Sequence, residues 1–328
     1  MTKNIIEPNQ IKKESDEIYD VIIIGGGPAG LTAGIYLSRA RMKILILEKL
    51  IAGGQAILTD TIENYPGFPD GISGSGLMQN MEKQAADFGT IIKYEEVVSI
   101  KNKKDSEIKI IKTLKNTYKS LSIIIATGAE ARKLNIPGEK RFLGRGVSYC
   151  GTCDAPFFKG KKIALVGGGD TAIEEALYLS KFAREVTVVH RRDRLRATKI
   201  LQERILSNKM INISWNSIPL EIIGQNKVEG ILLEDVKTNK EIDVKCDGVF
   251  IFIGYLPKTD FVKSILHIND KGYIKTDENM MSSINGIFAC GDVRQKMLRQ
   301  VITACGEGAT AAYASQKYVE ELKGTVYK

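Results

Sequence analysis

The feature that most constrains the fold is a glycine-rich loop that occurs twice, each time between a short β-branched run and an apolar-periodic segment. Such a loop lets the backbone turn sharply out of a buried parallel strand into a helix whose N-terminal N–H groups can face phosphate. Repetition of this unit predicts an α/β chain with two Rossmann-like dinucleotide-binding domains. In each copy we expect a strand, the loop, a helix and a second strand, at 21–24, 25–30, 31–39 and 44–47 and again at 163–166, 167–172, 173–182 and 186–189.

The first loop has glycine at the three positions that a dinucleotide site requires. Gly25 permits the turn, Gly27 lets the backbone approach a pyrophosphate, and Gly30 allows the helix to pack closely. Glu48 ends the second strand, where its carboxylate can accept hydrogen bonds from ribose hydroxyls. The first site is therefore predicted to bind a dinucleotide with a free 2′-hydroxyl.

The second loop differs at the position equivalent to Glu48. Both positions lie 23 residues after the first glycine of their loop, but the second copy has His190 there, followed by Arg191, Arg192 and Arg196. Guanidinium groups bind a 2′-phosphate through charge-assisted hydrogen bonds worth about 1.5–3 kcal/mol each, whereas a carboxylate would repel it. A solvated basic face is the alternative, but the position within the fold favours recognition of NADP.

Two dinucleotide sites in one chain imply a division of labour. Nicotinamide delivers hydride, and a flavin can accept two electrons and pass them to a thiol pair. FAD is therefore the expected occupant of the first site and NADPH that of the second. The residues of the first site alone leave NAD open there.

A C-x-x-C pair, Cys150 and Cys153, lies shortly before the second loop. A zinc site would need two further ligands at matching spacing, and the other three cysteines and both histidines are isolated in the sequence. A redox dithiol instead needs one thiol of lowered pKa, as C-x-x-C pairs provide. Asp154 is placed to exchange a proton with the thiolate. We predict redox chemistry at this pair and no metal site.

The strand order predicts that the first domain is discontinuous. The run at 123–126 would complete its sheet, and the runs at 249–253 and 286–289 are expected to return to it, because no partner strand is expected for them in the second domain. A helix at 300–322 would close it. We predict a polar N-terminal extension at 1–17, an FAD-binding domain at 18–130 and 252–328, an NADPH-binding domain carrying the C-x-x-C pair at 131–251, and a hinge at 129–132 and 253–256.

Charge and cysteine usage narrow the class of protein further. The net charge of +8 invites a nucleic-acid interpretation, but the lysines are scattered and the one dense basic run, 190–196, is explained by the nucleotide site. The longest apolar stretch, 249–256, is far shorter than the roughly 20 residues of a membrane span, and 2–17 lack a signal-peptide core. Five cysteines in 328 residues do not make a disulfide framework. We expect a cytoplasmic protein without a nucleic-acid or membrane partner.

Taken in order, these motifs resemble those of low-molecular-weight, bacterial-type thioredoxin reductases, a group of pyridine nucleotide-disulfide oxidoreductases. The resemblance runs from Tyr19 to Tyr318 and includes Gly53-Gly54-Gln55, Glu63-Asn64-Tyr65-Pro66-Gly67, Ala126-Thr127-Gly128, Gly291-Asp292 and Arg299-Gln300-Val301-Ile302-Thr303. It implies a homodimer in which electrons pass from NADPH through FAD to the Cys150–Cys153 disulfide. From there they would pass by thiol–disulfide exchange to oxidised thioredoxin or a thioredoxin-like protein.

The resemblance also implies roles for individual residues. Asp292 would bond the ribityl chain of FAD, Cys153 would be the thiol on the flavin side, and Cys150 would be the thiol that attacks the partner protein. The implied catalytic residues are Cys150, Cys153 and Asp154. The residues implied to contact FAD are Gly25, Gly27, Pro28, Ala29, Gly30, Glu48, Gly54, Gln55, Asn64, Thr127, Gly128, Gly291, Asp292, Arg299, Gln300 and Val301. The residues implied to contact NADPH are Gly167, Gly169, Asp170, Thr171, His190, Arg191, Arg192 and Arg196.

The sequence departs from the family pattern beside the dithiol. Gly151-Thr152 stands where Ala-Thr is usual, and Ala155-Pro156 stands where a glycine is common, and both could shift the redox potential. Three alternatives share parts of the pattern: an enzyme that takes electrons from ferredoxin or gives them to oxygen, a ferredoxin–NADP reductase, and a redox sensor without turnover. The arginine pair argues against the first and the C-x-x-C pair against the second. Absence of turnover with NADPH and any disulfide acceptor, despite bound flavin, would favour the third.

Overall fold

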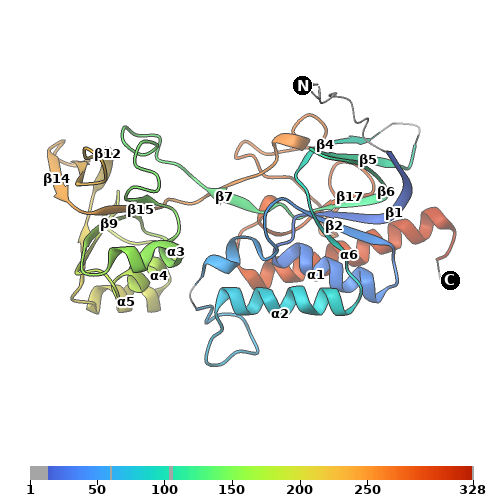
Figure 1. Cartoon of the computed structure of the whole chain (residues 1–328), viewed down its shortest axis with the longest axis horizontal. Coiled ribbons are helices and arrows are strands. Elements are labelled where there is room, and N and C mark those ends of the chain that lie inside the picture. The colour runs from blue at the N-terminus through green and yellow to red at the C-terminus, as the bar shows by residue number, and fades with distance from the viewer. Residues whose placement is uncertain (1–13, 60, 103–105, 327–328) are drawn as a thin grey trace, which may run out of the picture. The chain divides into compact units, whose positions relative to one another are not determined.

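The chain, seen in a computed structural model that describes residues 14–59, 61–102 and 106–326, folds into two compact units (Figure 1). The second unit, Glu130–Leu256 with Leu58 and Thr59, is inserted into the first, which resumes at Pro257. Apart from the short segment at Leu58 and Thr59, the chain passes between the units twice, at 129–130 and at 256–257. The two crossing segments, β7 (Ala129–Ala131) and β16 (Tyr255–Pro257), pair with each other.

The described part of the first unit contains a seven-stranded mixed sheet in the order β3-β2-β1-β6-β5-β4, with β17 also paired to β6. The pairs among β3, β2, β1, β6 and β17 are parallel, whereas β4, β5 and β6 are antiparallel to one another in turn. The strands are β1 (Glu14–Ile24), β2 (Ile44–Glu48), β3 (Ile92–Tyr94), β4 (Val97–Asn102), β5 (Lys109–Thr113), β6 (Thr117–Ile125) and β17 (Ile287–Ala289).

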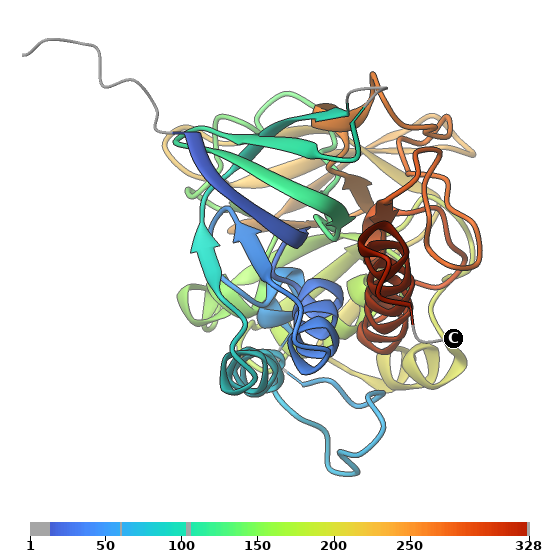
Figure 2. The same ribbon diagram turned by 90° about the vertical axis from the view of Figure 1, so that its right-hand side faces the viewer.

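Both faces of this sheet are buried, which explains why its central strands are apolar at successive positions. Val21 and Ile23 of β1 pack into the cluster formed with the helices, and Ile22 and Ile24 pack into a second cluster with residues of β4 and β5. Figure 2 shows the helices gathered along one face. They are α1 (Pro28–Arg39), α2 (Gly74–Asp87) and α6 (Val301–Lys323), and the short 3-10 turns of this unit are η1 (Gly54–Leu58), η3 (Asp260–Val262) and η4 (Gly291–Val293).

The second unit repeats this plan on a smaller scale. Its described residues form a parallel sheet in the order β11-β10-β9-β15-β8, with helices packed on one face and a three-stranded antiparallel sheet on the other. The elements are β8 (Val147–Ser148), α3 (Gly151–Asp154), η2 (Ala155–Phe158), β9 (Lys162–Gly167), α4 (Asp170–Leu179), β10 (Glu185–Val189), α5 (Lys199–Ser207), β11 (Ile211–Ser214), β12 (Ser217–Ile223), β13 (Gly230–Asp235), β14 (Glu241–Lys245) and β15 (Gly248–Phe252).

The structure confirms both predicted strand–loop–helix–strand repeats and the return of 286–289 to the first sheet as β17. The expected return of 249–253 to that sheet was wrong. This run forms β15, which lies between β9 and β8 in the second unit, with Val249 opposite Ala164. Its partner β8 has only two residues and no sequence signature of a strand.

The polar extension predicted at 1–17 needs a further correction. Residues 1–13 lie outside the described part of the chain, but Glu14–Glu17 belong to β1, where Glu14 pairs with Thr117. Backbone pairing to β6 thus lengthens the strand beyond the apolar run that predicted it. Among the residues that the structure describes, no helix is both long and apolar enough to cross a bilayer.

Candidate functional site

The first glycine loop has the geometry that its sequence predicts. Gly25 adopts a φ of +107°, and a Cβ atom there would collide with the carbonyl of Ala126. A Cβ atom on Gly30 would collide with the carbonyl of Gly25, so α1 packs directly against the strand end. At Gly27, which precedes α1, the nearest atom to such a Cβ is 3.9 Å away, on Gly54. The backbone at Gly27 is therefore open to a close-packed ligand such as a pyrophosphate.

Glu48 holds this loop in place. Its Oε2 accepts a hydrogen bond from the backbone N–H of Gly26 at 2.7 Å, and its Oε1 accepts one from the N–H of Leu50 at 3.0 Å. Each carboxylate oxygen can accept a second hydrogen bond. The carboxylate can thus fix the loop and still accept from a ribose hydroxyl, which remains the prediction for this residue.

Residues predicted for the same cofactor from the far end of the chain come together in the first unit. The amide of Asn64 donates to Oε1 of Gln300 at 3.1 Å, although 236 positions separate them. Nε of Arg299 is buried without a hydrogen-bond partner within the described residues, and the buried Oδ1 of Asp292 pairs with the ammonium of Lys296 at 3.2 Å. The guanidinium of Arg299 stacks over Tyr273, with its carbon 4.1 Å from the ring centroid. Buried polar atoms without partners mark a place where a ligand can supply the missing hydrogen bonds.

The other residues predicted to contact FAD lie at the starts of helices and in loops of the first unit. Pro28 and Ala29 form the first turn of α1, and Val301 is the first residue of α6. The hydroxyl of Thr127 donates to the carbonyl of Lys258 at 3.0 Å, and Gly128 adopts a φ of +65°. Gly54 and Gln55 begin η1, and Gly291 begins η4 with a φ of +74°.

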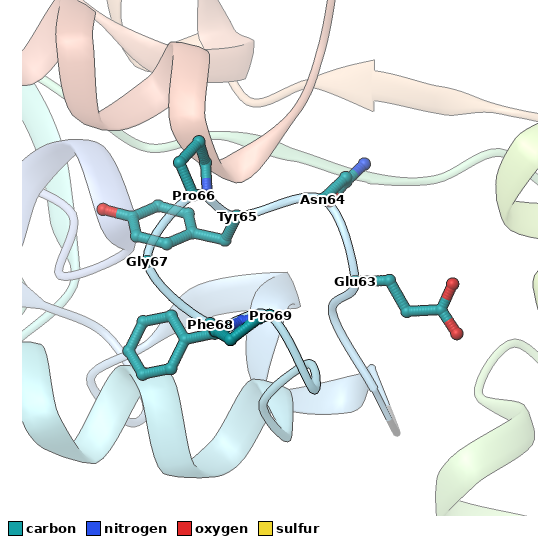
Figure 3. A pocket seen from close by; sticks show the side chains of 7 residues that line it. All are labelled: Glu63, Asn64, Tyr65, Pro66, Gly67, Phe68 and Pro69. Carbon is teal, nitrogen blue, oxygen red and sulfur yellow. The ribbon is translucent and has the colours of Figure 1, made fainter.

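The segment 63–69 forms a loop around a hollow of about 320 Å³. Figure 3 shows the side chains of Tyr65 and Phe68 on the same side of this loop, with Glu63 directed away. The two rings lie 6.1 Å apart, and burial together with the nearby Cys305 raises the pKa of Tyr65 to about 12. The rings anchor the loop that carries Asn64.

These features together fit FAD. The open backbone at Gly27 suits a pyrophosphate, Glu48 suits a ribose without a phosphate, and the Asp292 carboxylate, whose side chain is 38% accessible, suits a hydroxyl donor. Among the described residues other than its chain neighbours, no atom lies closer than 3.9 Å to where a Cβ on Gly27 would be.

The second glycine loop is held differently. A Cβ atom on Gly168 would collide with the ring of His190. That imidazole is 6% exposed, with Nδ1 2.8 Å from the carbonyl of Gly167 and Nε2 3.0 Å from the carbonyl of Arg194. His190 therefore ties the glycine loop to the arginine-rich segment. Its predicted contact with the cofactor stays a prediction, but both ring nitrogens already face backbone carbonyls.

Two further hydrogen bonds fix the arginine-rich segment beside the start of α4. The N–H of Arg196 donates to the carbonyl of Gly168 at 2.7 Å, and Oδ1 of Asp170 accepts from the N–H of Thr198 at 2.6 Å. An exposed guanidinium nitrogen of Arg196 lies 3.9 Å from where a Cβ on Gly169 would be. The other exposed residues predicted here, Arg191, Arg192 and Thr171, flank this point in the sequence. The loop thus presents cations next to a helix N-terminus, as a phosphorylated ribose requires.

Cys150 precedes α3 and is disulfide-bonded. Ser148 fixes its backbone, because the Ser148 hydroxyl accepts from the N–H of Cys150 and donates to its carbonyl, each at 3.0 Å. Asp154 ends α3 and is half-buried. The backbone of Cys153 lies in α3, but its side chain is outside what the structure describes. α3 packs against α4, so the dithiol segment adjoins the helix that the second glycine loop begins.

The unusual Gly151 has a structural reason. A Cβ atom at this position would collide with a carboxylate oxygen of Glu175 in α4. The carboxylate is the end of a flexible side chain, so it can move away. Glycine therefore allows this closer packing of α3 on α4, and alanine is tolerable at the expense of shifting Glu175.

The other three cysteines, at 246, 290 and 305, are free thiols and buried, as predicted for residues that fill small volumes. Burial raises the pKa of Cys246 to about 12 and also raises that of Cys290. Within the described ranges no group of three or more His, Cys, Asp and Glu side chains is gathered as a metal site. Buried neutral thiols are poor nucleophiles, so these three cysteines are not suited to disulfide exchange. The C-x-x-C segment that contains Cys150 remains the candidate redox site.

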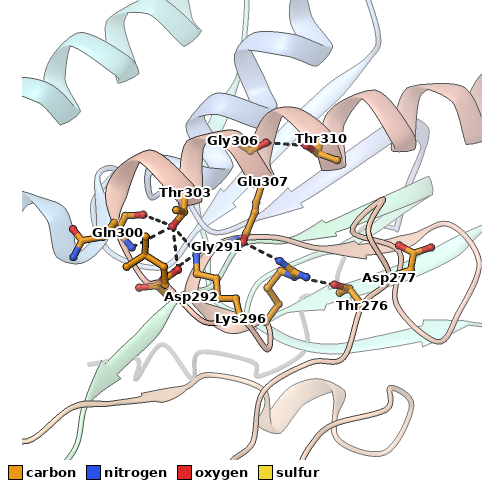
Figure 4. A network of polar contacts seen from close by, with 12 residues as sticks. Thr276, Asp277, Gly291, Asp292, Lys296, Gln300, Thr303, Gly306, Glu307 and Thr310 are labelled. Atoms are coloured by element: carbon orange, nitrogen blue, oxygen red, sulfur yellow. Dashed lines mark hydrogen bonds and ion pairs between the residues drawn. The ribbon is translucent and has the colours of Figure 1, made fainter. Parts of the chain in front are cut away.

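Sequence reasoning missed an ion cluster beside Asp292 (Figure 4). Glu307 of α6 accepts hydrogen bonds from the Arg294 guanidinium and from the N–H of Gly291, both at 2.8 Å, and Lys296 lies against the same carboxylate. The one available signal was the four-residue spacing of Asp292 and Lys296, which is common by chance.

Comparison with known proteins agrees with this geometry. Residues 19–308 match the family model described as pyridine nucleotide-disulphide oxidoreductase. Thioredoxin reductase of Treponema pallidum is 50% identical over 93% of this chain and 98% of its own, and that of Bacillus subtilis is 47% identical over 95% and 98%. The crystal structure of Lactococcus lactis thioredoxin reductase in the FR conformation superposes with a TM-score of 0.90 at 45% identity, covering 92% of this chain and 99% of that one.

The chain belongs to the pyridine nucleotide-disulphide oxidoreductase family. Within that family its full-length similarity is to the thioredoxin reductases, which confirms the resemblance and the pair of dinucleotide-binding folds predicted from the motifs. Membership implies FAD and NADPH as cofactors.

Proposed function

We propose that this protein is an NADPH-dependent thioredoxin reductase whose first unit binds FAD and whose second unit binds NADPH and carries the Cys150/Cys153 dithiol. The observation that carries the proposal is the position of the dithiol segment. Cys150 stands at the start of α3, which packs against α4, the helix that begins at the glycine loop flanked by arginines. Disulfide chemistry and recognition of a phosphorylated nucleotide thus share one unit.

The residues of each unit divide the binding work. Gly27, Glu48 and Asp292 would hold the pyrophosphate, the adenosine ribose and the ribityl chain of FAD, respectively. Arg191 and Arg192, with Arg196, would hold the 2′-phosphate of NADPH. Bound FAD supplies the capacity to accept two electrons from nicotinamide and return them to a disulfide.

The thiols complete the transfer by exchange. Two electrons and two protons convert the disulfide into two thiols. The thiolate of Cys150 attacks a disulfide sulfur of thioredoxin, a mixed disulfide forms, and the partner's second sulfur leaves as a thiolate. The thiolate of Cys153 then attacks the Cys150 sulfur and releases reduced thioredoxin. Asp154 would hold the proton exchanged at these sulfurs.

The proposal requires motion between the units, because nicotinamide and the dithiol share the second unit while FAD belongs to the first. We infer that β7 and β16 form the hinge, since the chain crosses between the units only there in the described residues from Thr61 onward. A cross-link between the units is expected to abolish turnover. Full turnover of the cross-linked protein would exclude the hinge.

By resemblance we also propose a homodimer that works in the cytoplasm, where a dithiol can be kept reduced. Light scattering of the purified protein tests the assembly, and a monomer at all concentrations would contradict it. Fractionation of the source cells tests the location.

Anaerobic titration tests the function itself. The purified flavoprotein is mixed with NADPH, its thiols are counted, and oxidised thioredoxin is then added. We expect two new thiols per chain and then their transfer to thioredoxin. Reduction by ferredoxin but not by NADPH would instead identify the ferredoxin-dependent alternative, and thiols that persist with every disulfide acceptor would identify a sensor.

A further inference from the structure

The ion cluster next to Asp292 contains a nearly inaccessible lysine. The side chain of Lys296 is 5% exposed. Its ammonium nitrogen lies 3.2 Å from Oδ1 of Asp292, 3.2 Å from the hydroxyl of Thr303 and 3.4 Å from Oε2 of Glu307. An ammonium has three donors, so three oxygens at these distances fully occupy it. A lysine confined in this way has little freedom to do anything but hold its neighbours.

Glu307 fixes the lysine from the opposite side. Its side chain is 14% exposed, and its carboxylate also accepts from the guanidinium of Arg294, whose Nε donates to the hydroxyl of Thr276 at 2.8 Å. The cluster therefore holds two cations and two carboxylates. The side chains of Lys296, Arg294 and Glu307 are only 5–14% exposed, so their charges are strongly coupled, because removing one leaves its partner uncompensated.

The lysine also connects two parts of the chain predicted to contact FAD. Asp292 lies in η4, whereas Thr303 lies in the first turn of α6 and forms a capping box with Gln300. One ammonium thus fixes the carboxylate relative to the start of the helix.

We propose that Lys296 is a positioning residue of the FAD site, which orients the Asp292 carboxylate for the ribityl chain and is itself located by Glu307. The inference rests on the proposed assignment of Asp292 to FAD. The ionic contact occupies the buried Oδ1, and 38% of the Asp292 side chain remains accessible, which leaves the other carboxylate oxygen to accept from a ligand. The carboxylate is thus held in one orientation while its accepting capacity stays available. Preorganisation of this kind lowers the entropy lost when a ligand binds.

The test measures release of FAD from the whole flavoprotein, followed as the rise of FAD fluorescence after dilution. Lys296→Met is expected to release FAD about tenfold faster, the effect of losing one charge-assisted interaction. Lys296→Arg retains the cation and is expected to restore most of the difference, and Lys296→Gln is expected to fall between them. Lys317→Met is the matched control, because Lys317 is a partly exposed lysine of α6 paired with Glu320 outside the cluster.

A double-mutant cycle separates positioning from general destabilisation. In an Asp292→Asn background, Lys296→Met is expected to accelerate release by less than about twofold, because the carboxylate it positions is gone. If the two substitutions accelerate FAD release by independent factors that multiply, the inference is overturned. Release of FAD from Lys296→Met at the parent rate would also overturn it. If Lys296→Met yields no folded protein, the order of Arg and Gln decides, and equal release from both overturns the proposal. Unchanged release from Asp292→Asn alone would instead refute the FAD assignment itself.

Discussion

The two glycine loops occupy equivalent places in the two units, and each is held by the residue 23 positions after its first glycine. In the first unit Glu48 accepts from a backbone N–H of its loop; in the second His190 bonds to a backbone carbonyl. The carboxylate keeps accepting capacity for a ribose, whereas both nitrogens of the imidazole are occupied by carbonyls. We therefore expect recognition of the nucleotide in the second unit to depend mainly on the arginines that follow. The residue at this position holds the glycine loop in both units, and in the first unit its carboxylate can also accept a hydrogen bond from the cofactor.

The largest effect is expected when the two thiols that only the second unit carries are removed. In Cys150→Ser/Cys153→Ser we expect thioredoxin reduction to fall to the uncatalysed level, because no thiol remains to exchange. Reduction of ferricyanide by NADPH is expected to continue, since it needs only the two dinucleotide sites. A thioredoxin assay and a ferricyanide assay on the same preparation check this. Cys246→Ala, at a buried free cysteine, is the control.

The single variants sharpen that result. Cys153→Ser is expected to accumulate a mixed disulfide between Cys150 and thioredoxin, detectable by mass on a non-reducing gel, whereas Cys150→Ser should not. Trapping by Cys150→Ser instead would reverse the roles of the two thiols. Thioredoxin reduction at the parent rate by the double variant would end the proposed mechanism.

The second test changes the specificity of the second loop. Arg191→Gln/Arg192→Gln is expected to raise KM for NADPH by at least about 10- to 100-fold, because even one charge-assisted bond to a 2′-phosphate contributes about 1.5–3 kcal/mol. KM for NADH should stay the same, since NADH lacks that phosphate. Steady-state kinetics with both nucleotides measure it, with Arg194→Gln as the control. An equal loss with both nucleotides would show that these arginines do not read the phosphate.

A smaller effect is expected at Glu48, which holds the first glycine loop. Glu48→Ala removes the acceptors of the Gly26 and Leu50 N–H groups and is expected to speed FAD release by about tenfold, the equivalent of roughly 1.4 kcal/mol. KM for NADPH should not change, because the other unit is untouched. The exposed Glu96→Ala serves as control. Release of FAD at the parent rate would mean that these two hydrogen bonds do not contribute to FAD binding.

The smallest effect concerns the packing of the dithiol segment. Gly151→Ala is expected to lower the free energy of unfolding by less than about 1 kcal/mol, since only the flexible end of Glu175 must move. Denaturant unfolding measures this. In a Glu175→Ala background the same change should cost nothing. A persistent cost there would assign the closeness of α3 and α4 to another contact.

The sequence predicts those parts of the molecule that depend on local chemistry. The turn at Gly25 and the close packing at Gly30 follow from glycine's missing Cβ, and the strands around them follow from apolar runs buried on both faces. The position of β15 could not be predicted in this way, because its partner β8 is defined only by tertiary pairing. The roles of His190 and Lys296 were likewise hidden, since a charged or polar residue reveals its burial only once the chain has folded around it.

The insertion described for the fold also sets the order in which the protein can be made. A ribosome completes Glu130–Leu256 before it reaches β17 and α6, which the first sheet and its helix layer still lack. Domains fold as units during synthesis, so we expect the second unit to fold while the first waits as an incomplete intermediate. Of the residues assigned to FAD, Asp292, Arg299 and those at the start of α6 emerge last. Incorporation of FAD would then be the final event of biogenesis, and a chain truncated before α6 would carry a nucleotide-binding unit with no flavin to reduce.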